Sequence, residues 1–448
     1  MLTATAAADA RTGRLTRAAD RPVASDSVAF FRIAYGLVGV LVAVRLLAHG
    51  WVDRLYLAPE EHLTFARFGW VEPLPGLLMY AHVALLGLLG AAIAVGLRSR
   101  LCTVLFVVAL GYLELIEATL YLNHYWFLLL AGVLIAVLPV HGRFSIDVAR
   151  GRRRSEPTVP ALVVWAFRAQ LAVVYGFAGL AKLNPDWLFD AQPLSLWFAD
   201  RADVAVVGGV LALPATAYVA SWAAAAFDLT VVAGLLHRRT RPFAYGAVLA
   251  FHGATGLLFQ IGVFPVVMIL GTLVFFAPDW PRRWGAAAPA RSASEPVAEV
   301  GSAVRVGLLA FAVLQVVLPL RHYAEPGNVR WNEDGYYLAW RVMLTEKAGF
   351  GTFVVTDPET DRSWIVEPDA VLEDWQVAAA MVRPDLVHAT ALLIEARQVD
   401  ALGRDVEVRA DVVVAMNGRP ARPLIDPTVD LTSVPRGSGV DAFVLPDG

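Results

Sequence analysis

The sequence predicts an α-helical polytopic membrane domain of about nine transmembrane helices, followed by a small extracytoplasmic α+β domain. Three observations lead to this fold class. Of the 448 residues, 57% are hydrophobic and only 17% are charged, which is far from the composition of soluble domains. Long apolar runs recur as far as Leu320. From Arg321 onward the pattern becomes that of a soluble domain.

The N-terminal residues 1–27 are polar, carry four arginines and contain no apolar run before Val28. A secretory signal peptide requires an apolar core, so we expect a disordered cytoplasmic tail here. The single cysteine, Cys102, excludes an intramolecular disulfide. The formal net charge of −3 does not favour a nucleic-acid partner, and no cysteine or histidine spacing typical of a metal site occurs.

Apolar runs long enough to cross roughly 30 Å of hydrocarbon define a transmembrane domain over 28–320. They lie near 28–49, 74–97, 101–121, 125–141, 160–182, 205–236, 242–260, 262–278 and 303–320. The seventh and eighth runs are joined by only three residues, 260–262, which also fits a tight re-entrant pair.

Arginines concentrate on one side of these runs. Besides the tail, they lie in the second, fourth, sixth and eighth connections: Arg98, Arg100, 143–154, 238–241, Arg282 and Arg283. Because cytoplasmic loops carry an excess of Lys and Arg, this alternation places the N-terminus in the cytoplasm. Everything after Leu320 is then expected outside it.

The residues 321–448 are expected to form the α+β domain. Alternating apolar residues predict strands over 351–357 and 363–368, and 406–426 predicts a hairpin that turns at Asn417-Gly418. The intervening 373–402 has apolar residues at helical spacing. An Ala-, Pro- and Ser-rich stretch, 285–302, predicts a cytoplasmic linker before the last span.

Lys182 closes the fifth span, and Asn123-His124 open the fourth span at the same membrane face. Polar groups inside spans are costly, so each needs a reason. A lysine at a helix end is most often an interfacial anchor, here paired with Asp186, and a lone histidine is most often structural. The alternative is an outward-facing pocket in which a neutral Lys182 acts as a base beside the Asn and His donors.

Four further ionisable residues lie in the expected spans. Glu117 lies one helical turn after Glu114 at the outer end of the third span. A carboxylate there is either paired with a base or protonated because of desolvation, and in the second case Glu117 is a candidate proton relay. Asp228 and His252 lie in the sixth and seventh spans, and the small residues after His252 favour a position beside a cavity.

Five stretches resemble, in order, the signatures of vitamin K-dependent γ-glutamyl carboxylase and its bacterial relatives, the HTTM-domain proteins. They are "LYLNHYW", "VVYGFAGLAKLNPDWL", "FHGATGLLFQIGVF" with "APDWPRRW" after it, "RWNEDGYYLAWRVML" and "DVVVAMNGRPARPLIDPTVDL". Each stretch alone would be weak, whereas five in the right order are specific. The resemblance extends from about residue 28 to about residue 435.

The resemblance implies an integral membrane enzyme that binds vitamin K hydroquinone among its helices and uses O₂ and CO₂ as co-substrates, without a metal. Lys182 matches the family's catalytic base, which must be neutral to act. His124, with Asn123 beside it, matches the pair that orients and stabilises the hydroquinone oxygen and the developing alkoxide. The positions that the resemblance implies for cofactor contact are Tyr121, Tyr175, His252, Phe264, Trp340 and Met343.

The chain also departs from the animal members of the family. Ala181 stands where they have a second lysine, and Tyr121 replaces a tryptophan. At 448 residues the chain is far shorter, so their additional extracytoplasmic modules are expected to be missing. The Arg-, Ala- and Val-rich composition is typical of a high-GC bacterium, which predicts the inner membrane as the location and menaquinol as the available quinol.

Three functions stay open at this point. The first is carboxylation of glutamate in an exported peptide or protein, coupled to oxidation of the quinol to its epoxide. The second is a quinone epoxidase without peptide carboxylation, which would share the base and the pocket. The third, of another class, is a non-catalytic membrane scaffold or transporter in which the polar residues only join helices. In each case the lipid bilayer is the first partner.

Overall fold

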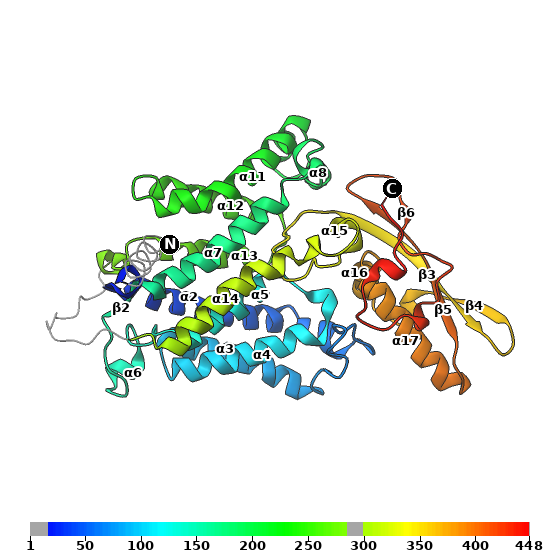
Figure 1. Cartoon of the computed structure of the whole chain (residues 1–448), viewed down its shortest axis with the longest axis horizontal. Coiled ribbons are helices and arrows are strands. Elements are labelled where there is room, and N and C mark those ends of the chain that lie inside the picture. The colour runs from blue at the N-terminus through cyan, green and yellow to red at the C-terminus, as the bar shows by residue number, and fades with distance from the viewer. Residues whose placement is uncertain (1–16, 285–298, 448) are drawn as a thin grey trace, which may run out of the picture.

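The computed structural model of the chain describes residues 17–284 and 299–447. A bundle of helices occupies one side of the molecule and a domain with a β-sheet the other (Figure 1). The first 16 residues of the expected tail, and most of the expected linker, 285–298, lie outside the described residues.

Within the described residues, each of the expected spans contains a helix. These helices are α2 (Asp26–Ala48), α3 (Leu77–Val95), α4 (Ser99–Ile116), α5 (Asn123–Val137), α7 (Ala161–Ala181), α11 (Pro214–Leu236), α12 (Arg241–Leu258), α13 (Phe264–Gly271) and α14 (Ser302–Leu320). Short helices lie in the connections: α6 (Ile146–Ala149), α8 (Pro185–Leu188), α9 (Leu194–Ala199), α10 (Gly208–Leu211) and α15 (Val329–Asn332).

By length and composition, 6 helices in the described ranges could cross a membrane: α2, α3, α4, α7, α11 and the segment Ser302–Tyr323 that includes α14. The other three differ in length or polarity. Helix α5 has 15 residues, α13 has 8 before a 3-10 segment, and α12 contains Arg241 and His252. The chain is therefore a helical membrane protein, while the expected nine crossings are more than these helices establish.

The helices form layers that Figure 1 shows from the side: α3 and α4 lie at one edge, α11 and α12 at the other, and α2, α7 and α13 between them. Helices α2 and α3 approach most closely at Gly36 and Gly90. A Cβ atom on Gly36 would lie 2.5 Å from the Gly90 carbonyl oxygen. Small residues at such crossings allow membrane helices to pack backbone to backbone.

The end of the bundle that lies far from the sheet domain is more ordered than the sequence predicts. Instead of a disordered tail up to residue 27, β1 (Pro22–Ala24) pairs antiparallel with β2 (Thr158–Pro160). Asp26 follows at the start of α2 and forms ion pairs with Arg143 at 3.0 Å and Arg282 at 2.7 Å. These partners lie more than a hundred residues away, so local sequence could not reveal them.

The C-terminal domain contains a four-stranded antiparallel sheet in the order β4-β3-β5-β6. Its strands are β3 (Lys347–Asp357), β4 (Arg362–Val366), β5 (Glu407–Met416) and β6 (Arg422–Pro423). The expected hairpin is confirmed, and its turn residues Asn417 and Gly418 have φ angles of 54° and 74°, which Asn and Gly tolerate best.

Two helices cover one face of this sheet. The helical spacing expected over 373–402 is borne out by two helices, α16 (Asp374–Ala380) and α17 (Pro384–Leu402). They are separate because Pro384 has no amide hydrogen to continue the first helix. Val408 and Val412 of β5 are buried together with Val387 of α17 in the core of the domain. The alternation of buried and exposed residues along β5 follows from this one-sided cover.

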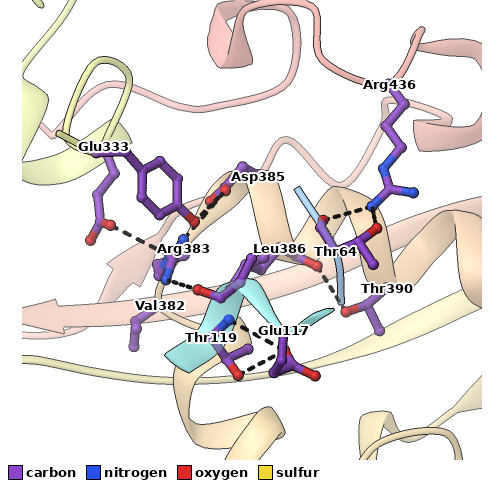
Figure 2. Close-up of polar contacts among 12 residues, drawn as sticks. Thr64, Glu117, Thr119, Glu333, Val382, Arg383, Asp385, Leu386, Thr390 and Arg436 are labelled. Carbon is purple, nitrogen blue, oxygen red and sulfur yellow. Dashed lines mark hydrogen bonds and ion pairs between the residues drawn. The ribbon is translucent and has the colours of Figure 1, made fainter. Parts of the chain in front are cut away.

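Figure 2 shows how the C-terminal domain is fixed to the bundle, at the link between α4 and α5. Glu117 accepts hydrogen bonds from Thr119 and, at 2.7 Å, from the side chain of Gln376. Arg383 donates to the carbonyl oxygen of Ala118 at 3.2 Å. Nearby, Arg436 donates to the carbonyl oxygen of Thr64 at 2.8 Å. Side chains of the C-terminal domain therefore satisfy polar groups of the bundle.

Candidate functional site

The main cavity of the bundle has a volume of about 370 Å³ and lies between α7, α11 and α12. Helix α9 and the segment around Met343 close it on the side of the C-terminal domain. Its wall is almost wholly apolar and rich in aromatic rings: Trp187, Trp197, Phe198, Phe227, Phe251, Phe259 and Phe264. The few polar side chains that reach it therefore stand in surroundings of low polarity, where charge is poorly solvated.

Lys182 directly follows the end of α7, and this position places it at the edge of the cavity. Helix α7 ends at Ala181, and Asn184 then caps α8 by accepting a hydrogen bond from the Trp187 amide at 3.1 Å. Lys182 thus lies in the link between the helices, where its amine turns back and donates to the Ala178 carbonyl oxygen at 3.2 Å. Lys182 is only 5% exposed, so its amine faces the interior.

The partner of the Lys182 amine is Asp228 of α11. Nζ lies 2.8 Å from Oδ2 of Asp228, and both side chains line the cavity. The ring of Trp187 also lies close, with its centroid 5.2 Å from Nζ. Asp228 was visible in the sequence as a lone carboxylate in an apolar span, but only the packing of α7 against α11 brings it to Lys182.

The expected anchor between Lys182 and Asp186 is wrong. Asp186 points to the C-terminal domain, where it accepts from the Asn417 amide at 2.8 Å and pairs with Arg330 at 3.0 Å and with Arg419. Burial opposes ionisation of this carboxyl, but the Asn417 hydrogen bond and the two guanidiniums together hold the pKa of Asp186 below its ordinary value. Through these contacts Asp186 joins α8 of the bundle to the C-terminal domain.

Tyr175 and His252 form a second polar group on the cavity wall. The Tyr175 hydroxyl lies 2.9 Å from Nε2 of His252, and both residues are 2% exposed. The other ring nitrogen of His252, Nδ1, is buried and has no hydrogen-bond partner among the described residues. Both expected cofactor positions thus lie on the cavity, and His252 retains a free polar atom.

His124 comes close to the cavity without lining it. It begins α5, and its ring centroid lies 6.1 Å from that of Phe264, which is itself 5.7 Å from that of His252. Phe264 lines the cavity and His124 does not. Nε2 of His124 is buried and unpaired among the described residues. The aromatic ring of Phe264 therefore separates His124 from the other polar groups.

Tyr121 and Asn123 contact a loop rather than the cavity. The Tyr121 hydroxyl accepts from the Leu338 amide at 2.9 Å, and the Asn123 side chain donates to the Arg341 carbonyl oxygen at 3.4 Å. Met343, at the end of this loop, lines the cavity, whereas the neighbouring Trp340 is fully buried behind it. These expected site residues are thus connected to the cavity through Met343.

The loop 338–343 is conformationally strained. Leu338, Trp340 and Met343 have φ angles of 59°, 57° and 53°, a region that residues other than glycine rarely occupy. Such strain persists only where surrounding contacts over-determine the backbone, and it concentrates at functional sites. The hydrogen bonds from the segment that begins α5 provide such contacts.

Glu117 is not brought to the cavity. Besides the hydrogen bonds from Thr119 and Gln376, it accepts from the Leu63 amide at 3.3 Å, and His62 lies 3.2 Å away. Glu117 is therefore fully occupied at the contact between the bundle and the C-terminal domain. Among the described residues, no group of three or more His, Cys, Asp or Glu side chains could hold a metal ion.

Comparison with known families divides the chain in two. Residues 20–280 match the HTTM domain, and residues 301–447 match the lumenal domain of vitamin K-dependent gamma-carboxylase. The second match begins before α14, so this helix falls with the C-terminal part and not with the first match. No solved structure matches the chain. Because the HTTM match covers more than half of the 448 residues and the lumenal-domain match most of the rest, the chain belongs to the HTTM-domain family, as a vitamin K-dependent carboxylase-like member.

Proposed function

We propose that the chain is a vitamin K-dependent carboxylase-like membrane enzyme. It would oxidise a quinol, menaquinol in a bacterial inner membrane, to its epoxide with O₂, and couple this reaction to addition of CO₂ to glutamate side chains of an exported peptide or protein. The observation that carries this proposal is the Lys182–Asp228 pair, a titratable amine and carboxylate 2.8 Å apart in an apolar cavity between membrane helices.

The cavity fits a reduced naphthoquinone in size and in chemistry. Its volume of about 370 Å³ and its aromatic wall suit a flat bicyclic ring. Polar groups stand at two places, Lys182 with Asp228 and Tyr175 with His252, which matches a ring that carries two oxygens. The unpaired Nδ1 of His252 adds a free polar atom. When bound, the quinol would supply the electrons and, with O₂, the strong base that removal of a glutamate proton requires.

Lys182 and Asp228 can handle protons as a unit. Nζ and Oδ2 lie 2.8 Å apart, so a proton can pass from the amine to the carboxylate. The pair then consists of a neutral amine and a carboxylic acid. In this form Nζ can accept a proton from a bound hydroxyl.

The other expected site residues take roles that follow from their positions. Tyr175 and His252 would hold the second oxygen, and Phe264 and Met343 would form the wall against the ring. Tyr121, Asn123 and Trp340 would act through the loop 338–343 by positioning Met343. A rotation of the Phe264 ring would join His124 to the cavity, so His124 would assist Lys182 only after this movement.

We also propose the topology that the arginine distribution predicts, with nine crossings, a cytoplasmic N-terminus, a transmembrane catalytic domain up to residue 320 and an extracytoplasmic domain after it. The position of α5, α12 and α13 within the bundle supports this count. Helices of 15 and 8 residues need continuation by irregular backbone, which membranes tolerate when protein covers it. Glu117 would then lie at the outer end, where it joins the halves rather than relaying protons.

The deciding experiment uses the full chain in lipid nanodiscs with reduced vitamin K, O₂, labelled bicarbonate and a glutamate-rich peptide. Formation of the epoxide together with label in the peptide is the expected result. Epoxide without label would leave quinone epoxidation alone as the function. Absence of both, with the quinol bound equally well by wild type and Lys182→Ala, would favour a non-catalytic membrane role and overturn the proposal.

A further inference from the structure

A second cavity, of about 360 Å³, lies behind the turn that carries Lys182. The two cavities share their wall. Lys182 borders the main cavity, whereas its neighbours Ala181 and Leu183 border the second. The loop beyond α14 is divided in the same way, with Met343 on the main cavity and Arg341 on the second. Whatever occupies the second cavity therefore touches the backbone that positions the first.

The lining of this second cavity is apolar on one side and polar on the other. Leu180, Leu183 and Leu320, at the ends of α7 and α14, supply the apolar side and are 54%, 51% and 41% exposed. The polar side is formed by Asn184, His322, Glu325, Asn328, Arg330 and Arg341. Both candidate membrane spans end here, at Ala181 and Tyr323. The ends of membrane-spanning helices lie where hydrocarbon meets head groups, so we expect the cavity to open at this boundary.

Helix α14 leaves room for a chain-like ligand beside it. Within α14, Gln315 and Pro319 are the buried residues, and one weak hydrogen bond of 3.4 Å joins Gln315 to Gln170 of α7. A helix so loosely packed along its length must have its remaining apolar surface covered by lipid. An acyl chain that follows α14 toward its end would arrive at the second cavity.

Arg341 is a buried cation without a counter-charge. Arg341 is 8% exposed, and its Nε atom has no hydrogen-bond partner among the described residues. Nη2 donates to Nε2 of His322 at 2.8 Å. The other nitrogen of that ring lies 2.8 Å from the Pro319 carbonyl oxygen and donates to it, so His322 accepts from Arg341 as a neutral ring.

The charged neighbours of Arg341 do not pair with it. Glu325 also lines this cavity, but it forms no ion pair with Arg341 in the described part of the chain. Arg330 is satisfied by Asp186 at 3.0 Å, whereas Arg341 forms no ion pair in the described part of the chain. A guanidinium does not lose its proton in proteins, and a buried charge without a partner is strongly unfavourable. An anion in the cavity would remove this penalty, because its oxygen atoms could accept from Nε.

We propose that the second cavity binds an anionic glycerophospholipid of the leaflet next to the C-terminal domain, with its phosphate at Arg341 and one acyl chain between α7 and α14. A phospholipid satisfies both sides of the lining, which neither a free anion nor a polar peptide does. Because the cavity shares its wall with the main one, the bound lipid would hold the Lys182 turn and the loop 338–343 in place. This inference does not depend on the quinol chemistry.

The test measures thermal unfolding of the full chain in a neutral detergent, with added phosphatidylglycerol or phosphatidylcholine. We expect phosphatidylglycerol to raise the unfolding midpoint and phosphatidylcholine to leave it unchanged. In Arg341→Gln, which keeps a donor for His322, phosphatidylglycerol should bind at least about tenfold more weakly, since a hydrogen bond to a charged group is lost. The matched control Arg54→Gln removes an exposed arginine outside this cavity and should keep the wild-type response.

Three outcomes would overturn the proposal. Equal stabilisation of wild type and Arg341→Gln by phosphatidylglycerol would mean that the lipid binds elsewhere. Equal stabilisation by inorganic phosphate would mean that an anion without chains is sufficient. Competition between a glutamate-rich peptide and phosphatidylglycerol, abolished in Arg341→Gln, would assign the cavity to a peptide carboxylate. If Arg341→Gln does not fold, Leu320→Trp fills the apolar side instead, and native mass spectrometry should then find less co-purified phosphatidylglycerol than in wild type.

Discussion

The amine of Lys182 and the carboxylate of Asp228 lie 2.8 Å apart although 46 residues separate them in the chain. Neither residue has another charged partner in the described ranges. Their contact joins the end of α7 to the middle of α11, and it makes the properties of each group depend on the other. The first predictions follow from this dependence.

Replacement of Lys182 by arginine should abolish quinol oxidation. The guanidinium would keep the pairing with Asp228 but cannot become neutral at any accessible pH, so it cannot accept a proton. Epoxide formation in nanodiscs measures the effect. The matched control is Lys347→Arg, which conserves the ion pair with Glu333 in the C-terminal domain. Wild-type turnover in Lys182→Arg would exclude the base role.

Asp228→Asn should lower the turnover number by about 10²-fold or more, the usual range for loss of a positioned proton acceptor. The amide can still accept a hydrogen bond from Nζ, but unlike a carboxylate it cannot take a proton from the amine. The quinol KM should change little, because size and shape are conserved. Asp190→Asn, at an exposed carboxylate, serves as the control. A raised KM with unchanged turnover would show that Asp228 only shapes the cavity.

Tyr175→Phe should weaken quinol binding more than it slows turnover. Without the hydroxyl, the second oxygen of the bound quinol loses one of its two proposed hydrogen-bond partners, and a buried polar group left unsatisfied costs about 1–3 kcal/mol. We therefore expect a KM for quinol at least about fivefold higher. Tyr218→Phe, at a half-exposed tyrosine of α11, should behave as wild type. The prediction fails if turnover falls while KM is constant.

Low pH should weaken the attachment of the C-terminal domain to the bundle, because Asp186 becomes protonated. Because the folded-state pKa of this carboxyl is held below its ordinary value, its contribution to stability is complete above the unfolded pKa of about 4 and is lost as pH falls through the folded pKa. Limited proteolysis of the C-terminal domain between pH 3 and pH 7 would measure this. In Asp186→Asn, protection at pH 7 should fall by about 2 kcal/mol, and the dependence on acid should flatten.

The proposed topology predicts opposite labelling of two exposed loops. In a Cys102→Ser background, Arg152→Cys lies at the far end of the bundle and Asp361→Cys in the turn between β3 and β4. A membrane-impermeant maleimide applied to intact cells should label the second position and spare the first until the cells are lysed. Labelling of both in intact cells, or of the first alone, would contradict the proposed orientation.

Local signals in the sequence predicted local structure well. The hairpin turn at Asn417-Gly418 followed from backbone preferences of two adjacent residues, and the apolar runs followed from composition. The helical spacing over 373–402 likewise predicted helix there, and the break between α16 and α17 lies just before Pro384. Turns and helices that are set by adjacent residues can therefore be predicted from the sequence.

The site was predictable only in part, because its contacts are long-range. The lysine was expected to pair with Asp186, four residues away, but helix packing gives it Asp228 and gives Asp186 to the C-terminal domain. His124 and Lys182 were expected to share one pocket, and the ring of Phe264 stands between His124 and the cavity. Family resemblance supplied candidate residues, and it did not indicate which of them touch the cavity and which lie behind its wall.

The contacts of Asp186 with the C-terminal domain have a mechanical consequence. This carboxylate lies in α8, four residues after Lys182, and it is bound by two arginines and an asparagine from beyond α14. Any tilting of the C-terminal domain would pull directly on the segment that carries Lys182. The position of the Lys182 amine therefore depends on both halves, and a chain cut after residue 320 should yield a bundle in which this amine is displaced from Asp228.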